Sequence, residues 1–456
     1  MAMNGCSGMA QQGVKAQATV ARTAALCGRG MRRALALLGI VVVGNSAAQA
    51  EESRFANPFY RAESDSLRLI GLGPISNLDS VVSELLQAEQ QYDAVFPVLV
   101  VDPVRLYWRK VKADLYDRYG LALGMNYTAL FQAASDGLPG KDRQGASGDF
   151  DFYGRWEVVN RGGSWTGSIV FSTEFRHGYG STTPADLGTN IGSLWRTTGG
   201  FNDEAFTLNE IFWKQGSFED RVLYGVGKFD PGLFIDGGSY TSSNYNFLSP
   251  AIGGSLTMPI PSTGLGAGLA WFPYKNTYVS ASLTDANGSK EGWGDLGAGE
   301  LFSAIELGLV PGFGTPEEGR YHVNFWHLNG ADDGNDGASS GWGFSLYAEQ
   351  HFGQYVPFVR YAEGTGAGLP VRRTAAAGLG FERPFGQNND LIGFGLGWGE
   401  PVNQDKSDQY VFEAFYRVQL TPATQLTPDL QIIFNPVDNP EENAIAVGGI
   451  RLRTLF

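Results

Sequence analysis

The strongest constraint on this chain is an alternation of apolar and polar residues with a period of two, which continues from Gly120 to Phe456. This period is typical of β-strands, because successive side chains of a strand point to opposite faces. The five clearest segments have one face without any charged residue; they cover 121–131, 150–158, 165–175, 410–420 and 446–456. The opposite face, within and adjoining these segments, contains nine charged residues: Asp151, Arg155, Glu157, Glu174, Arg176, Glu413, Arg417, Arg451 and Arg453.

Alternation alone fits a soluble β-sandwich as well as a membrane barrel, and segment length separates the two. Strands of globular proteins average about five or six residues, whereas a tilted strand that crosses a bilayer needs about 9–11. The clear segments here have nine to eleven residues. No run of about 18 apolar residues, as a membrane-spanning helix requires, occurs in the sequence. We therefore expect an all-β fold, a transmembrane antiparallel β-barrel.

The same pattern predicts about sixteen strands. Their expected ranges are 120–132, 149–159, 164–176, 206–215, 220–229, 263–271, 277–284, 300–309, 319–328, 341–352, 355–362, 374–383, 390–399, 409–420, 428–435 and 444–456. The connections should mostly alternate between long and short, as in bacterial outer-membrane barrels. The long ones include 133–147, 177–205, 230–262 and 329–340. The segment from Asp230 to Ser262, which contains Tyr240, Tyr245 and Phe247, is the candidate for a loop that constricts the pore, with a surface cap as the alternative.

The first 50 residues have the features of an export signal. Residues 31–50 combine a basic start, an apolar stretch from Ala34 to Val43 and the small-residue exit Ala48-Gln-Ala50. Residues 1–30 are then expected to be upstream sequence from a start codon placed too early. Removing residues 1–50 would leave 28 Lys plus Arg against 47 Asp plus Glu, and no cysteine. So acidic a chain argues against a nucleic-acid partner.

Residues 51–119 are expected to form a periplasmic helical extension or plug before the barrel at 120–456. Helical periodicity occurs at 78–92 and again at about 104–119. A module that binds a partner is the alternative for this segment.

A barrel of sixteen strands encloses an aqueous channel, so the charges on the inner faces become candidate channel-lining residues. They are Arg155, Glu157, Glu174, Arg176, Lys228, Glu349, Arg360, Glu413, Arg417, Arg451 and Arg453. Their mixed signs argue against a ring selective for anions or cations. Together with Tyr153, Tyr347 and Phe415, they suit neutral polyhydroxylated solutes, which are small sugars. No cofactor, no metal site and no catalytic residue is predicted.

Enzyme and metal patterns in the sequence are weak. His322 and His327 should point to opposite faces of one strand, and Ser172 close to His177 is too common a pair to indicate a hydrolase. The acidic stretch 332–336 lacks the twelfth-position Glu of a calcium-binding EF-hand loop. We therefore expect the protein not to be an enzyme.

Phe456 ends the last alternating strand, in which Ile450 and Leu452 should face outward. A lipid-exposed open sheet edge is forbidden, so this strand must pair with the first. A terminal aromatic residue in this position resembles the signal that barrel assembly machinery recognises in the bacterial outer membrane. The expected partners are therefore that machinery and outer-membrane lipid.

The C-terminal stretches 416–422, 426–436 and 448–453 resemble the end of OprB-type carbohydrate-selective porins, and 210–215 with 225–230 resembles that family's mid-barrel pattern. The resemblance covers roughly Tyr119 to Phe456. It implies a sixteen-stranded outer-membrane channel for sugars, with basic and acidic residues at a constriction. The chain departs from the family before the first strand, where 108–118 replaces a Gly-rich, Arg-containing segment.

Two other functions stay open on the sequence alone. Arg417, Arg451 and Arg453 would suit a general or anion-preferring porin, and a barrel enzyme or binding protein is the third option. The sequence also leaves open which sugar passes and whether the barrels associate as homotrimers.

Overall fold

The computed structural model describes residues 81, 84, 85, 87, 94–96, 102–161, 165–217, 221–332, 338–386 and 389–456. The expected upstream segment 1–30 and signal 31–50 lie outside the described residues, as do 51–80 and residues 333–336 of the acidic stretch. Within the described part of the chain, no helix combines the length and apolar character needed to cross a membrane.

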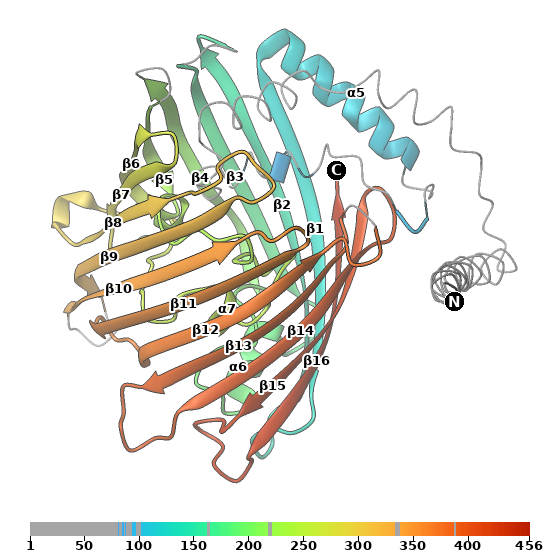
Figure 1. Ribbon diagram of the computed structural model, residues 1–456, viewed down its shortest axis with the longest axis vertical. Helices are drawn as coiled ribbons and strands as arrows, with labels where there is room; N and C mark the ends of the chain where they lie inside the picture. Colours follow the sequence, from blue (N-terminus) through green and yellow to red (C-terminus); the bar gives the residue numbers. More distant parts are fainter. Residues whose placement is uncertain are drawn as a thin grey trace, which may run out of the picture. The chain divides into compact units, whose positions relative to one another are not determined.

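Sixteen antiparallel strands, all among the described residues, form one closed barrel (Figure 1). The predicted strand number and fold class are confirmed. The strands are β1 (Leu121–Ala134), β2 (Gln144–Val159), β3 (Gly167–Gly178), β4 (Glu204–Ser217), β5 (Val222–Phe229), β6 (Gly264–Tyr274), β7 (Thr277–Asp285), β8 (Leu301–Leu309), β9 (Gly319–Asp332), β10 (Ala338–Gln350), β11 (Tyr355–Gly366), β12 (Val371–Glu382), β13 (Leu391–Pro401), β14 (Gln409–Gln419), β15 (Thr424–Phe434) and β16 (Ala444–Leu455).

The barrel closes between its first and last strands. β1 pairs with β16 in a register that runs from Asn126 opposite Leu455 to Ala134 opposite Val447. The two strands lie side by side in Figure 1, cyan against red. Each strand also pairs with its neighbour in sequence, so the wall has no open edge.

Two expected long connections are shorter than predicted. The length expected for the connection 329–340 is wrong, because β9 extends to Asp332 and β10 starts at Ala338. The connection expected at 133–147 is reduced to 135–143, since β1 and β2 extend past the predicted ends. Gly and Ser in these stretches mimic loop composition, yet cross-strand pairing overrides their low strand propensity. The long connections 179–203 and 230–263 are observed.

The helix expected at about 104–119 is α5 (Asp102–Tyr119), which ends one residue before Gly120 and β1. Gly120 has φ +73° and accepts this left-handed conformation because it has no Cβ. Within the segment expected at 78–92, residues Val81, Glu84, Leu85 and Gln87 are helical.

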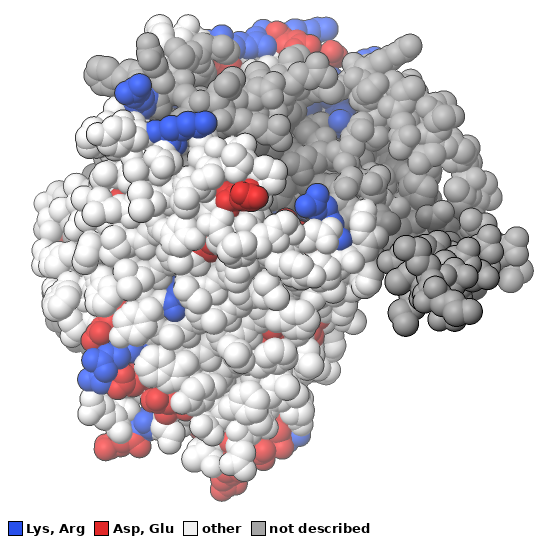
Figure 2. Space-filling model, in the orientation of Figure 1, with Lys and Arg blue, Asp and Glu red and all other residues white. Residues whose placement is uncertain are grey.

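The outer wall is apolar. Large apolar side chains with 40–60% exposure alternate with buried residues along the strands; examples are Leu269, Ile305, Phe325, Leu396 and Ile450. In Figure 2 the wall that faces the viewer is largely uncharged, and most charged side chains lie toward its two ends. Such an extended exposed apolar surface is unusual for a soluble protein and matches a lipid-facing belt. Ile450 and Leu452 face outward as predicted.

Two long connections contribute buried residues to the interior of the barrel. The first is 179–203, which contains α6 (Pro184–Asn190). The second is 230–263, called here the constriction loop, which contains η3 (Pro231–Leu233) and α7 (Pro250–Gly253). Their apolar residues share a buried cluster with inward-facing residues of β10 to β16, which includes Leu187, Trp195, Phe247, Ile252, Phe358 and Val411. The interior of the barrel, called here the lumen, is thus narrowed by the chain itself.

Candidate functional site

The constriction loop is held across the lumen by three carboxylates from three strands. Each carboxylate accepts backbone N–H groups of the loop: Glu306 of β8 from Asp236 at 2.5 Å, Glu349 of β10 from Ser239 at 3.1 Å, and Glu413 of β14 from Leu248 at 2.6 Å and Ser249 at 2.9 Å. Hydrogen bonds from amides to buried carboxylates are stronger than neutral ones. The loop is therefore fixed at points far apart around the wall.

Three arginines and one histidine of the wall also hold the constriction loop. Arg451 donates from Nη1 to the carbonyls of Ser243 at 2.5 Å and Asn246 at 2.8 Å. Arg417 donates to the carbonyl of Tyr245 at 3.1 Å. Arg360 pairs with the Asp236 carboxylate, and His322 Nε2 lies 2.9 Å from the Gly237 carbonyl. The inward charges of β8 to β16 thus bind both the amides and the carbonyls of one loop.

Two glycines of the wall make room for aromatic side chains of the loop. A Cβ at Gly380 of β12 would overlap the Tyr240 hydroxyl, and one at Gly268 of β6 would overlap the Phe234 ring. Burial raises the pKa of the Tyr240 phenol above its usual range, so this hydroxyl stays protonated.

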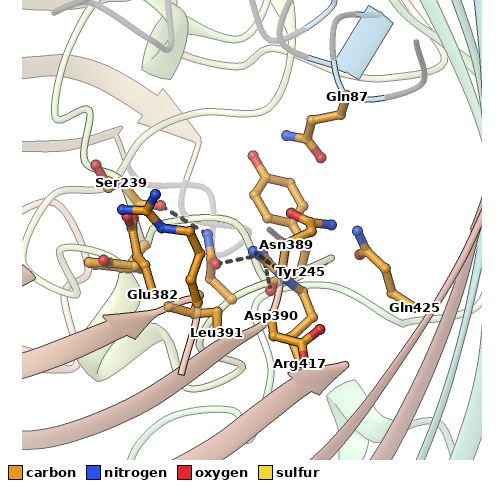
Figure 3. A pocket seen from close by; sticks show the side chains of 12 residues that line it. Gln87, Ser239, Tyr245, Glu382, Asn389, Asp390, Leu391, Arg417 and Gln425 are labelled. Atoms are coloured by element: carbon orange, nitrogen blue, oxygen red, sulfur yellow. Dashed lines mark hydrogen bonds between the residues drawn. The ribbon is translucent and has the colours of Figure 1, made fainter. Parts of the chain in front are cut away.

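A cavity of about 250 Å³ lies between the constriction loop and β12 to β15 (Figure 3). Its lining is mostly polar and includes two guanidiniums, two carboxylates, amides and two aromatic rings: Gln87, Ser239, Tyr240, Tyr245, Asn246, Glu382, Arg383, Asn389, Asp390, Leu391, Arg417 and Gln425. Burial raises the pKa of Tyr245, so its phenol is neutral and can donate or accept a hydrogen bond. Arg417 lies 6.0 Å from the centroid of this ring.

A second cavity, of about 840 Å³, lies against the same loop and has a different lining. Glu210 and Asp230 face it, with Asp236, Glu84 and Arg320. Gln87, Ser239 and Tyr245 line both cavities. These three residues therefore lie where the two spaces meet, in the narrow part of the lumen.

The three aromatics expected to accompany the charged lining residues are in the lumen, but they are covered. Tyr153, Tyr347 and Phe415 are each less than 5% exposed. Phe415 packs edge-on against Phe247 of the constriction loop, with ring centroids 5.0 Å apart. The expectation is wrong in this respect, because segments of the chain that fold inward cover wall residues that strand alternation alone leaves open. Tyr245 is the aromatic residue that lines both cavities.

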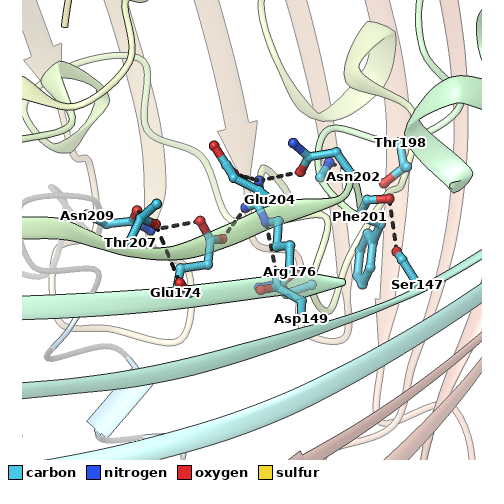
Figure 4. A network of polar contacts seen from close by, with 12 residues as sticks. Ser147, Asp149, Glu174, Arg176, Thr198, Phe201, Asn202, Glu204, Thr207 and Asn209 are labelled. Carbon is cyan, nitrogen blue, oxygen red and sulfur yellow. Dashed lines mark hydrogen bonds and ion pairs between the residues drawn. The ribbon is translucent and has the colours of Figure 1, made fainter. Parts of the chain in front are cut away.

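A separate charge cluster occupies β2, β3 and β4 (Figure 4). Arg176 pairs with Glu174 and contacts Asp149 at 3.4 Å and Glu204 at 3.7 Å. Lys290, from the connection 286–300, contacts Glu174 at 2.8 Å and Glu204 at 2.6 Å. Carboxylate oxygens of Asp149, Asp151 and Glu174 lie within 4.8 Å of one another. The two cations share this acidic group.

All eleven predicted lining residues lie on the inner side of the barrel, but they form four separate groups. Glu349, Arg360, Glu413, Arg417 and Arg451 hold the constriction loop. Glu174 and Arg176 belong to the charge cluster, and Lys228 donates to the Lys290 carbonyl at 2.7 Å. Arg155 and Glu157 lie 3.7 Å apart near α5, where Tyr116 donates to Glu157 at 3.2 Å. Arg453 contacts Glu84 and Gln87.

Several residues of the site were missed. Glu306 and His322 lie on the inward faces of β8 and β9, and the alternation that identified the other lining residues could have identified them. Asp236, Lys290, Glu84 and Gln87 come from connections or from the N-terminal segment, where no sequence period fixes the direction of a side chain.

The weak hydrolase pair does not come together. Ser172 faces the lumen and donates to Glu210 at 3.0 Å, whereas His177 lies 3.0 Å from the Tyr127 hydroxyl. His322 is buried and His327 is exposed on the other face of β9, as predicted.

A closed barrel of sixteen strands with an apolar outer belt and a polar lumen narrowed by an inward loop defines a porin. A sequence model described as the carbohydrate-selective porin, OprB family, matches residues 164–456. The chain belongs to this family. The match begins after the start of the expected resemblance at Tyr119, but both end at Phe456.

Individual relatives agree with this assignment. Porin AaxA of Chlamydia pneumoniae is 24% identical over 317 residues, which cover 65% of this chain and 69% of the relative. Porin AaxA of Chlamydia abortus is 26% identical over 316 residues, which cover 65% and 67%. The high-pH structure of Pseudomonas putida OprB shares the fold with a TM-score of 0.61 at 14% identity, covering 76% of this chain and 97% of that one. The family and the fold point to a channel rather than an enzyme.

Proposed function

We propose that this porin lies in the bacterial outer membrane and admits small carbohydrates by passive diffusion. The observation that carries the proposal is the lining of the cavity of about 250 Å³, where Tyr245 lies beside a guanidinium, carboxylates and amides. A sugar offers many hydroxyls that both donate and accept, and apolar C–H faces. A site with a ring and a few polar groups of both kinds suits such a solute.

The charges at this cavity do not favour one ion sign. Arg383 and Arg417 are matched by Glu382 and Asp390, and amides of Asn389 and Gln425 complete the lining. An ion of either sign would be both attracted and repelled there, whereas a neutral solute would not be repelled. The balance of charge therefore supports a neutral permeant.

The test is single-channel conductance in a planar bilayer with glucose and larger sugars titrated in. We expect an open channel whose current falls with sugar concentration and saturates, because a bound sugar obstructs the narrow part. A conducting channel that is indifferent to every sugar would overturn the carbohydrate proposal and leave a general porin. Absence of current would overturn the channel itself.

Replacing the ring should weaken the block. We expect Tyr245→Ala to raise the half-blocking sugar concentration roughly 2- to 10-fold, the value of one aromatic contact. The matched control is Phe394→Ala, which removes an exposed ring from the outer wall. An equal effect of both variants would contradict a sugar site at Tyr245.

An anion-preferring porin is the second candidate, and it rests on Arg417, Arg451 and Arg453. Against it, these guanidiniums bind carbonyls of the constriction loop or the Glu84 carboxylate. If it is correct, neutral replacement of Arg417 and Arg453 abolishes anion preference in salt-gradient recordings. Unchanged selectivity removes this candidate.

The same proposal includes three partners. The outer belt contacts outer-membrane lipid, the barrel assembly machinery recognises Phe456, and two further copies of the chain complete a homotrimer. Light scattering of the protein in mild detergent tests the last of these, and a monomer would overturn it.

A further inference from the structure

A short N-terminal segment, defined by Val81, Glu84, Leu85 and Gln87 and called here the plug segment, lies inside the barrel. Leu85 is fully buried and Val81 is 3% exposed. Both belong to one buried cluster with Ala122 of β1, Tyr153 of β2 and Tyr116 of α5. The Leu85 side chain also lies beside Gly124, where a Cβ would be 3.1 Å from Leu85 Cδ2. An apolar anchor therefore fixes the segment to the inner face of β1 and β2.

The polar residues of the plug segment contact the same part of the wall, on β1 and the adjacent β16. Arg453 of β16 pairs with the Glu84 carboxylate, and its Nη1 donates to Gln87 Oε1 at 3.0 Å. Asn126 of β1 donates to Glu84 Oε2 at 3.4 Å. Arg453 is only 1% exposed, so a nearby carboxylate is needed to compensate its buried charge.

The plug segment also reaches the constriction loop. The Arg453 guanidinium lies over the Tyr245 ring, 4.8 Å from its centroid, while it binds Glu84 and Gln87. Gln87 lines both cavities, and Glu84 lines the larger one. Figure 3 shows Gln87 and Tyr245 on the same side of the smaller cavity. The wall, the loop and the plug segment therefore converge at Arg453.

The chain that follows the plug segment is attached at the end of the barrel where β14 stops. Val95 N donates to the Gln419 carbonyl at 3.1 Å and Phe96 N to the Leu420 carbonyl at 2.7 Å. These bonds are separate from the contacts of Glu84 and Leu85, so two independent sets of contacts hold the N-terminal region against the barrel.

We propose that the plug segment is a built-in part of the constriction, and that Glu84 determines its charge by neutralising Arg453. The effect of Glu84 on ion selectivity rests on the proposed channel function, but the position of the segment can be tested without measuring any current. In this arrangement Glu84 and Gln87 are specificity-determining residues contributed from outside the strands.

The first experiment tests position by thiol labelling of the folded full-length protein, in a background with Cys6→Ser and Cys27→Ser. Gln87→Cys should resist a polymer-coupled maleimide that is too large for the lumen. The control Asp114→Cys, on the exposed side of α5, should react with it rapidly. Equal reaction of both variants would overturn the proposal, whether or not the protein conducts.

The second experiment tests charge. Glu84→Gln should shift the reversal potential in a KCl gradient toward that of chloride, because Arg453 loses its compensating carboxylate. Arg453→Gln combined with Glu84→Gln should restore the wild-type value, and Asp114→Asn should leave it unchanged. If Glu84→Gln leaves the reversal potential of a conducting channel unchanged, the proposal fails while the channel stands. A wild-type protein without current would instead reject the channel, and the labelling result would still decide where the segment lies.

Discussion

Glu413 shows how much one side chain contributes to the narrow lumen. The residue is fully buried, and each of its carboxylate oxygens accepts one backbone N–H of the constriction loop. In Glu413→Gln one of these acceptors becomes an NH2 group that faces an N–H donor. We expect the attachment of 248–249 to weaken by about 1–3 kcal/mol, or roughly 5- to 150-fold in local opening.

Hydrogen exchange followed by mass spectrometry checks this prediction. Peptides that contain Leu248 and Ser249 should exchange faster in Glu413→Gln. The matched control is Glu363→Gln, which removes a carboxylate that pairs with Arg373 at 3.2 Å away from the loop. Unchanged protection in Glu413→Gln would show that the other contacts alone hold the loop.

His351 is a second residue with a clear prediction, at the turn 351–354. Its Nε2 lies 3.8 Å from Glu382, and Nδ1 lies 2.9 Å from the Glu318 carbonyl. The nearby Glu382 carboxylate raises the pKa of His351 above its usual value near 6.5. Since the folded pKa is the higher one, the stabilisation is full below about pH 6.5 and is lost as pH rises through the folded pKa.

Histidine NMR can follow this titration, because the chain has four histidines. We expect Glu382→Gln to lower the midpoint of His351. Glu317→Gln, at an exposed neighbouring position, should leave it in place. A His351 midpoint that is the same in Glu382→Gln as in the wild type would contradict the pairing.

At the scale of elements, the connection 286–300 supplies a second cation to an acidic part of the wall. Lys290 and Arg176 are shared among Asp149, Glu174 and Glu204. In Lys290→Met one positive charge is lost, so we expect the channel to become more cation-preferring. Because the Debye length is about 10 Å at 0.1 M and 3 Å at 1 M salt, the shift should be largest in dilute salt.

Reversal potentials at both salt concentrations measure this effect, with Lys275→Met as the control. Lys275 is exposed at the tight turn between β6 and β7, on the opposite end of these strands. Equal shifts in the two variants would mean that the charge cluster does not face the permeating ions.

The strands could be predicted from the sequence, whereas the shape of the pore could not. Alternation fixes the face of each strand residue, so Arg451, Arg453 and Glu413 were expected in the lumen, and they lie there. It says nothing of what fills the lumen. That Glu413 would bind Leu248 and Ser249, 164 or more positions away, follows from closing the barrel, which brings β5 and β14 around one loop. Glu84 and Lys290 were missed for the same reason.

At the scale of the whole molecule, one pairing turns a sheet into a barrel. β16 pairs with β1, and beyond its last residue Phe456 N donates to the Met125 carbonyl at 2.9 Å while Met125 N donates to the Phe456 carbonyl at 3.2 Å. Phe456 therefore has a structural role through its backbone, besides the recognition that we propose for its ring. The two roles predict different results for two changes at the same position.

Phe456→Ala keeps both backbone hydrogen bonds and removes the ring. We expect this variant to refold from urea into lipid as well as the wild type does, but to reach the outer membrane in smaller amounts in cells. Deletion of Phe456 removes the bonds as well and should also lower the unfolding temperature of the refolded barrel. Leu452→Ala, which trims an outward apolar side chain of the same strand, controls for lost lipid contact. Normal assembly of Phe456→Ala in cells would show that closure of the barrel, rather than an aromatic signal, is what the last residue provides.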